Sequence, residues 1–114
     1  MYKKPRVKID YSHIVLPKDK NIISGDNFYI KKDYNESYIF ALSDGMGSGH
    51  NAYIESADTL KLMANLSSYH FSFKTILKLL EDIYSLRCDY DSYATLDLAL
   101  INTSNMKLNL YKIN

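Results

Sequence analysis

Apolar and polar residues alternate with a period of two over much of this chain, and with a helical period through its middle. Alternation with a period of two is typical of strands that bury one face. It occurs in five segments, residues 7–16, 22–30, 38–43, 93–101 and 106–113. Gly25, Asp26 and Asn27 interrupt the second segment, and a glycine inside a strand indicates a bulge or a close backbone approach. The pattern therefore predicts five strands.

Two helices are predicted between the third and the fourth of these strands. The first begins near Gly49 or His50 and runs to about Leu66. Its apolar stripe consists of Tyr53, Ile54, Ala57, Leu60, Met63 and Ala64. The second helix follows Ser72, a residue type that caps helix N-termini. Its apolar positions at i, i+3, i+4 and i+7 spacing are Phe73, Ile76, Leu77, Leu80, Ile83 and Tyr84.

The element order β-β-β-α-α-β-β predicts an α+β fold. Short links favour antiparallel pairing of consecutive strands, and helices grouped in the middle argue against a repeated βαβ fold. The last strand stops at Asn114 with no turn or capping element after it. We therefore expect residues 1–114 to form a single domain that is a piece of something larger.

Composition mainly excludes classes of function. The 14 Lys and Arg residues nearly balance the 13 Asp and Glu residues, so the charge gives no support to nucleic-acid or anionic-membrane binding. The lone Cys88 excludes an internal disulfide and a cysteine-rich zinc site, and it is compatible with a reducing compartment. The sequence has neither a run of about 18 apolar residues nor a signal peptide. We expect a cytoplasmic chain, whose parent would need other segments to reach a membrane.

Residues Ser43–His50 join the third strand to the first helix and contain three of the four glycines. Asp44 at the end of a strand, followed by glycines and a helix N-terminus, suits a metal or phosphate site. Glycine lets the backbone approach a ligand closely, and the helix N-terminus offers free N–H groups. An ordinary glycine-rich turn fits the same spacing, so both interpretations stay open on spacing alone.

Asp26 and Asp44 form the most informative pair of residues. If the second and third strands make a hairpin that turns near residues 33–36, the two aspartates lie side by side. Paired carboxylates with a backbone carbonyl form a hard oxygen site that suits Mg²⁺ or Mn²⁺ rather than zinc. Two such ions activate a water and clamp a phosphoryl group. The alternative is that both aspartates bond to local backbone at strand ends.

Other polar residues give weaker signals. His50 directly follows the glycine loop and is the histidine best placed to face a substrate, with a surface or capping role as the alternative. Asn27, directly after Asp26, is a second candidate to face a substrate. Asp91 and Asp97 lie before and within the fourth strand, where exposure to solvent is the default and a place near the metal region is the alternative. The sequence has no P-loop, nucleophile-elbow or metalloprotease motif.

Several motifs together resemble, in order and spacing, the first half of the stage II sporulation protein E phosphatase domain. They are Ile23–Phe28, Leu42–Gly49, Glu55–Leu62, Ile83–Arg87 and Tyr93–Leu98. The resemblance extends over residues 20–114. That family is of the PPM type, related to protein phosphatase 2C. Its members are metal-dependent protein serine/threonine phosphatases with a β-sandwich flanked by helices.

The resemblance implies roles for three residues. Asp44 would bridge two Mn²⁺ or Mg²⁺ ions, the Gly45 carbonyl would be a ligand, and Asp26 would act on the same cluster directly or through water. The metal-bound water would attack the phosphorus in line. The substrate would be a phosphoserine or phosphothreonine on a small anti-sigma-factor antagonist, in the setting of sporulation. The two central helices resemble those that switch the sporulation enzyme between inactive and active states.

The chain ends before the second half of the family domain, which supplies a further aspartate and a late acidic ligand. We therefore expect weak metal binding, an incomplete site and poor activity of the chain on its own. Missing strands leave unpaired edges, which invite homodimerisation. Two other interpretations stay open. One is a non-catalytic module of phosphatase-like fold that binds a phosphoprotein or a sigma-factor regulator. The other is a structural α+β domain in which the Asp-Gly turn is coincidental.

Overall fold

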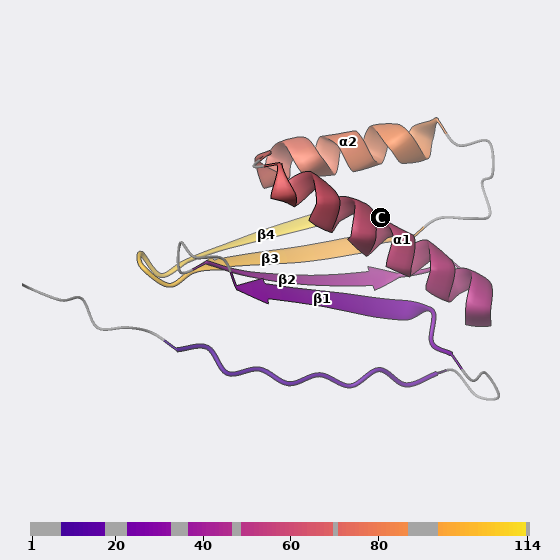
Figure 1. Ribbon diagram of the computed structural model, residues 1–114, viewed down its shortest axis with the longest axis horizontal. Coiled ribbons are helices and arrows are strands. Elements are labelled where there is room, and N and C mark those ends of the chain that lie inside the picture. The colour runs from indigo at the N-terminus through magenta and orange to yellow at the C-terminus, as the bar shows by residue number, and fades with distance from the viewer. Residues whose placement is uncertain are drawn as a thin grey trace, which may run out of the picture.

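The computed structural model describes residues 8–17, 23–32, 37–46, 49–69, 71–86 and 94–113. These residues form β1 (Asp26–Lys32), β2 (Ser37–Asp44), α1 (Gly49–Ser68), α2 (Phe73–Ser85), β3 (Leu96–Asn102) and β4 (Lys107–Ile113). The strands make one antiparallel sheet in the order β1-β2-β3-β4, and both helices lie over one side of it (Figure 1). The expected α+β class, with antiparallel neighbours and two central helices, is confirmed. Neither described helix is long and apolar enough to span a bilayer.

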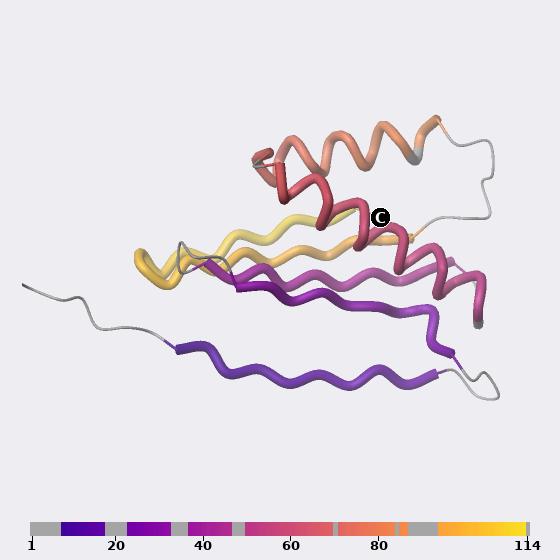
Figure 2. Tube along the Cα trace, viewed as in Figure 1, coloured from indigo at the N-terminus to yellow at the C-terminus, as the bar shows by residue number. Residues whose placement is uncertain are grey.

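The first predicted strand does not belong to this sheet. Residues 8–17 are extended, pair with no described strand, and run along the side of the sheet away from the helices (Figure 2). Tyr11 packs edge-on against Phe40, with 5.6 Å between ring centroids, and His13 lies 3.6 Å from the ring centroid of Phe28. The alternating residues predicted a strand, but they place the rings of Tyr11 and His13 against the side of the sheet away from the helices. The observed order is β-β-α-α-β-β, so the prediction was wrong in its first element.

The sheet has a helix face and an open face, because successive side chains of a strand point to opposite sides. On the helix face, buried residues of the strands and the helices form the core. They are Ile39, Ala41, Leu96, Leu98 and Ile113 from the sheet, with Leu60, Met63, Ile76, Leu77 and Leu80 from the helices. The open face is also apolar, yet Leu42, Leu108 and Leu110 remain 49%, 57% and 72% exposed on it.

Helix α2 follows the predicted pattern. The Thr75 N–H donates to the Ser72 hydroxyl at 3.2 Å, and the Ile76 N–H donates to the Ser72 carbonyl at 3.0 Å, so Ser72 caps the helix as expected. Ile76 and Leu80 are fully buried against the sheet, whereas Leu79 is 36% exposed. The amphipathic spacing therefore placed the correct face of α2 on the core.

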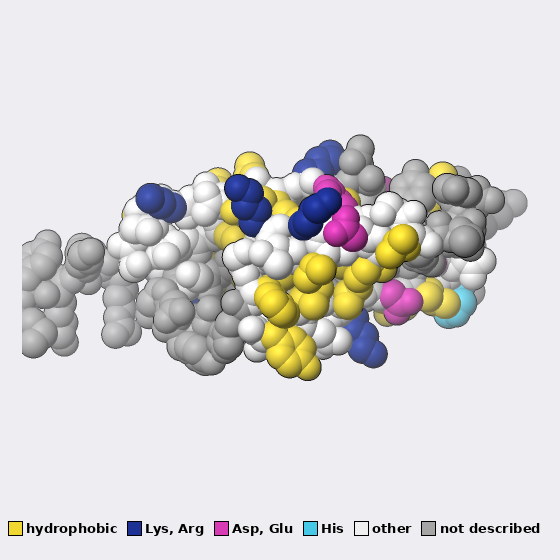
Figure 3. Space-filling view, turned by 90° about the horizontal axis from the view of Figure 1, so that it is seen from above, with side chains coloured by type: hydrophobic (Ala, Val, Ile, Leu, Met, Phe, Trp, Pro, Cys, Tyr) yellow, Lys and Arg dark blue, Asp and Glu magenta, His cyan; other side chains and the backbone are white. Residues whose placement is uncertain are grey.

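Helix α1 buries a face that only partly matches the predicted one, because Leu60 and Met63 are buried as expected. Tyr53 and Ile54 are exposed, whereas Ala52, Ser56 and Thr59 are buried. Small side chains let the helix lie close to the strands. The two buried hydroxyls donate to carbonyls of their own helix, Ser56 to Tyr53 at 3.0 Å and Thr59 to Glu55 at 2.9 Å. In the N-terminal part of α1, small and hydroxyl residues thus take the buried positions expected for Tyr53 and Ile54. Hydrophobic side chains form a band on the outer side of the helix layer (Figure 3).

Candidate functional site

Asp26 and Asp44 lie opposite each other at one end of the open face. Asp26 begins β1, Asp44 ends β2, and the register of the two strands makes them Cα partners. The hairpin prediction that placed them side by side is therefore confirmed. Directly opposite residues in an antiparallel pair have Cβ atoms about 5 Å apart, and like charges there destabilise the sheet. A bound cation would remove that repulsion.

Hydrogen bonds from both neighbouring segments fix the backbone that carries Asp44. The Thr95 N–H donates to the Asp44 carbonyl at 2.9 Å, and the Asp44 N–H donates to the Thr95 hydroxyl at 3.3 Å. The fully buried Ser43 donates its hydroxyl proton to the Thr95 carbonyl at 2.7 Å. On the other side, the Gly45 N–H donates to the Gly25 carbonyl at 3.0 Å. The site backbone is thus held before any ligand binds.

Two glycines allow helix α1 to press on this backbone. A Cβ added to Gly45 would meet the carbonyl carbon of Ala52 at 2.6 Å and its Cα at 2.9 Å. A Cβ added to Gly25 would meet the Cβ of Ala52 at 2.7 Å. Ala52 itself is fully buried. The first turn of α1 therefore sits directly on the residues that flank Asp26 and Asp44, with no space for a side chain at either glycine.

The donor set fits a hard divalent cation in type but is small in number. Carboxylate and carbonyl oxygens are the ligands that Mg²⁺ and Mn²⁺ take. Among the described residues, no three His, Cys, Asp or Glu side chains lie close enough together to hold a metal ion. The coordination shell is thus only partial, with Asp26, Asp44 and the Gly45 carbonyl as its candidate ligands.

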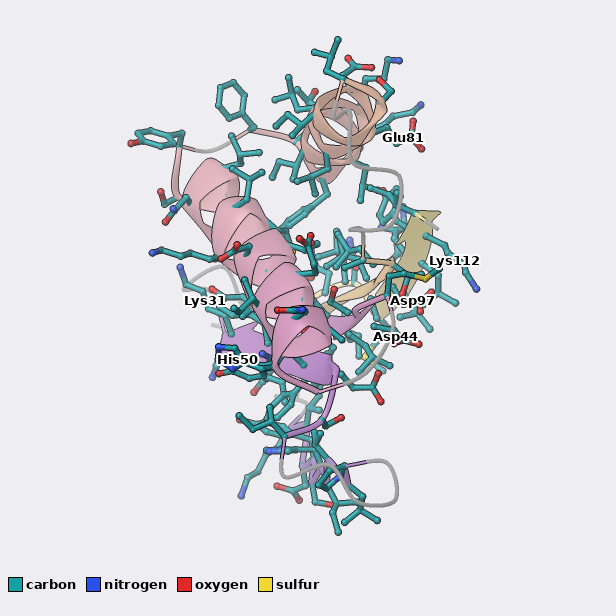
Figure 4. All side chains as sticks on the ribbon, turned by 90° about the vertical axis from the view of Figure 1, so that its right-hand side faces the viewer. Lys31, Asp44, His50, Glu81, Asp97 and Lys112 are labelled. Atoms are coloured by element: carbon teal, nitrogen blue, oxygen red, sulfur yellow. The ribbon has the colours of Figure 1, made fainter. Side chains whose placement is uncertain are left out.

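The other predicted site residues fall in different places. His50 is exposed in the first turn of α1, and it lies on the other side of that helix from Asp44 (Figure 4). Asn27 pairs with the buried Ser43, so its side chain is on the helix face, where its Oδ1 accepts the Phe28 N–H at 3.2 Å. Neither residue joins the aspartate pair. Asp91 lies outside the described residues.

Asp97 is on the open face near the pair, together with a lysine that the sequence reasoning missed. Asp97 is the Cα partner of Leu42 on one side and of Lys112 on the other. The Lys112 Nζ lies 3.9 Å from the Asp97 Oδ1, in an exposed ion pair. The missed signal was the alternation of β4, in which Lys112 occupies the same phase as Leu108 and Leu110.

Comparison with known proteins matches most of the chain to one family. A family model described as stage II sporulation protein E matches residues 34–113, which include Asp44, Gly45, Asp97 and Lys112. The stage II sporulation protein E of Priestia megaterium is 33% identical over 96 residues, which is 84% of this chain and 16% of that protein. The same protein of Bacillus subtilis (strain 168) is 32% identical over 96 residues, or 84% of this chain and 12% of that protein.

Solved structures agree with the family match. The phosphatase domain of SpoIIE from Bacillus subtilis, solved with a fragment of its regulatory domain, superposes with a TM-score of 0.67 at 26% identity, covering 82% of this chain and 32% of that one. RsbX in complex with magnesium superposes with a TM-score of 0.68 at 26% identity, covering 87% of this chain and 46% of that one. This chain therefore spans less than half of each solved relative. By sequence and by fold, it belongs to the stage II sporulation protein E family, whose phosphatase domain is of the protein phosphatase 2C type.

Proposed function

We propose that this chain carries the first metal ligands of a protein phosphatase that hydrolyses phosphoserine or phosphothreonine on a protein. The observation that carries the proposal is the register that sets Asp26 opposite Asp44, with Gly45 directly after Asp44. Family membership supports the reaction class. The similarity to RsbX, which was crystallised with magnesium, supports a divalent cation.

The proposed roles are those that the family resemblance implies, and the donor atoms are compatible with them. Asp44 and the Gly45 carbonyl oxygen would hold Mg²⁺ or Mn²⁺, and Asp26 would act on the same site directly or through a water. Bound Mg²⁺ or Mn²⁺ supplies a water of lowered pKa and neutralises charge on the phosphoryl oxygens. The chain itself contributes rigidity, because the bonds to Thr95 and Gly25 hold the backbone of Asp44 and Gly45 in place.

A phosphorylated protein is the substrate class that the family implies, and we propose a protein of the anti-sigma-factor antagonist type. We also propose that residues 1–114 form the first part of one phosphatase domain. The extent of the structural matches supports this division, since the chain spans 32% of the SpoIIE chain and 46% of the RsbX chain. The site would then gain further ligands from outside this chain.

A non-catalytic module that binds a phosphoprotein or a sigma-factor regulator is the second candidate. The absence of a group of three metal-binding side chains among the described residues favours it. A cation held by few ligands binds weakly. Recognition of a phosphate through such a cation would not require turnover.

Hydrolysis of p-nitrophenyl phosphate with Mn²⁺ tests the proposal. We expect slow, metal-dependent turnover that is lost in Asp44→Asn and kept in Asp58→Asn, a matched control on the exposed side of α1. Turnover that does not depend on Asp44 would contradict the proposed site. Rapid Asp44-dependent turnover would contradict only the expectation of an incomplete site. No turnover with Asp44-dependent metal binding would favour the non-catalytic module.

A further inference from the structure

Lys112 is a lysine at a position where the alternation of β4 calls for an apolar residue. It follows Leu108 and Leu110 on the open face and lines a groove of about 540 Å³ between residues 11–13 and the sheet. Most side chains around that groove are apolar, and Asp97 lies beside Lys112. Neither charge contributes to the core between the sheet and the helices.

The strand register places Lys112 at the same end of the sheet as the aspartate pair. Lys112 pairs with Asp97, Asp97 pairs with Leu42, and Leu42 stands two residues before Asp44 on the same face. Seen from that end, Asp44, Asp97 and Lys112 follow one another across the sheet (Figure 4). The row therefore runs from Asp44, the proposed metal ligand, to the ammonium group of Lys112.

The spacing of this row suits one phosphoryl group. Two strand spacings and two residues along a strand separate the Cα atoms of Asp44 and Lys112 by about 12 Å. The lysine stem reaches about 6 Å from its Cα. Both side chains stand on the open face, so the Lys112 ammonium meets the Asp44 carboxylate directly only if both side chains lean fully along the sheet. When they stand up from the sheet, the space between them admits a divalent cation, at about 2 Å per metal–oxygen bond, and a phosphate oxygen about 3 Å from the ammonium.

The present partner of Lys112 does not hold it firmly. The two charged groups are 3.9 Å apart, and their side chains are 70% and 50% exposed. Exposed ion pairs of this length contribute little to stability. A phosphoryl group has three strong acceptor oxygens, so one of them can accept from the ammonium while others face the cation.

We propose that Lys112 binds the phosphoryl group of a phosphate monoester at the Asp26–Asp44 site, with Asp97 as its resting partner. This inference rests on the proposed function and adds a residue to it. Binding exchanges the Asp97 carboxylate for a phosphoryl oxygen, so Asp97 competes with the ligand. Removing Lys112 should therefore lower phosphoryl affinity and removing Asp97 should not, whereas a purely structural ion pair predicts a loss in both cases.

Calorimetric titration of the full chain with phenylphosphonate, in excess Mg²⁺, tests the assignment. Lys112→Met should weaken phenylphosphonate binding about tenfold, and Lys112→Arg should restore it to within about twofold. Asp97→Asn should leave the affinity unchanged or raise it. Lys107→Met, on the same strand at the other end, is the matched control and should bind as the unmodified chain does.

The outcomes separate this inference from the function on which it rests. Mn²⁺ binding to each variant is measured in parallel and should be unchanged in Lys112→Met. Equal phenylphosphonate affinity in Lys112→Met and the unmodified chain, with Asp44-dependent Mn²⁺ binding intact, would overturn the role of Lys112 alone. Equal losses in Lys112→Met and Asp97→Asn would also overturn it. Absence of Asp44-dependent metal binding would overturn the proposed function as well.

Discussion

Gly45 lies so close to the backbone of Ala52 that a Cβ at position 45 would come within 2.6 Å of the Ala52 carbonyl carbon. Gly25 makes a different contact, because a Cβ there would clash with the Ala52 side chain, at 2.7 Å, and would approach backbone atoms no closer than 3.5 Å. Both glycines therefore contact α1 at Ala52. Gly45 contacts the Ala52 backbone, and Gly25 contacts the Ala52 side chain. The difference makes the junction between α1 and the site testable.

We expect Gly25→Ala and Gly45→Ala each to lower the free energy of unfolding by about 1–3 kcal/mol, because both overpack a buried contact. Ala52→Gly costs about 1 kcal/mol by itself through its helix propensity. Added to Ala52→Gly, the Gly25→Ala change should cost little more, since its clashing atom is gone. Gly45→Ala should keep its full cost, because its clash is with backbone.

Urea unfolding midpoints at a constant slope measure the three single and two double variants. Recovery of Gly45→Ala by Ala52→Gly would show that α1 does not press on the site backbone in the way described. Failure of Gly25→Ala to recover would show that the Ala52 methyl group is not its obstacle.

Tyr11 should hold residues 8–17 on the open face through its contact with Phe40. Tyr11→Ala is expected to lower the free energy of unfolding by about 0.5–1.5 kcal/mol beyond the lost apolar area, as for other edge-on aromatic pairs. Ile14→Ala is the control, since Ile14 is 79% exposed, and should change stability by no more than about 0.5 kcal/mol. Unfolding in urea gives both values, and equal effects of the two changes would contradict the seating of Tyr11 on the sheet.

Leu80 and Leu79 are neighbours on α2 with opposite environments. Leu80→Ala should cost about 2–5 kcal/mol, because it leaves a cavity between helix and sheet. Leu79→Ala should cost much less, since Leu79 is 36% exposed whereas Leu80 is fully buried. Circular dichroism during urea unfolding measures both. A larger loss of unfolding free energy for Leu79→Ala than for Leu80→Ala would contradict the assignment of the buried face of α2.

The hairpin of β1 and β2 and the helix α2 could both be predicted from the sequence. The register of Asp26 and Asp44 followed from counting outward from one turn, because pairing in a hairpin is symmetric about the turn. α2 has clear amphipathic spacing and a Ser72 cap, so local pattern and tertiary packing agree. Such agreement makes an element predictable from sequence alone.

Elements placed by tertiary contacts were not predictable in the same way. Residues 8–17 alternate like a strand, but only the packing of Tyr11 and His13 shows that they lie on the sheet and not within it. The burial of Ala52 in the first turn of α1 depends on the glycines at 25 and 45. The periodicity of apolar residues within the helix contains no information about these glycines. Lys112 became a candidate only once the sheet register placed it in line with Asp97 and Asp44.

Titration of the chain with Mn²⁺, followed by the electron paramagnetic resonance of the free ion, tests the central claim most directly. The account predicts weak, saturable binding, because the available oxygens fill only about half of an octahedral shell. Asp44→Asn and Asp26→Asn should each abolish saturation, whereas Asp58→Asn should leave it unchanged. Binding that survives in both Asp44→Asn and Asp26→Asn, or that is absent from the unmodified chain, would contradict the assignment of this aspartate pair as a metal site.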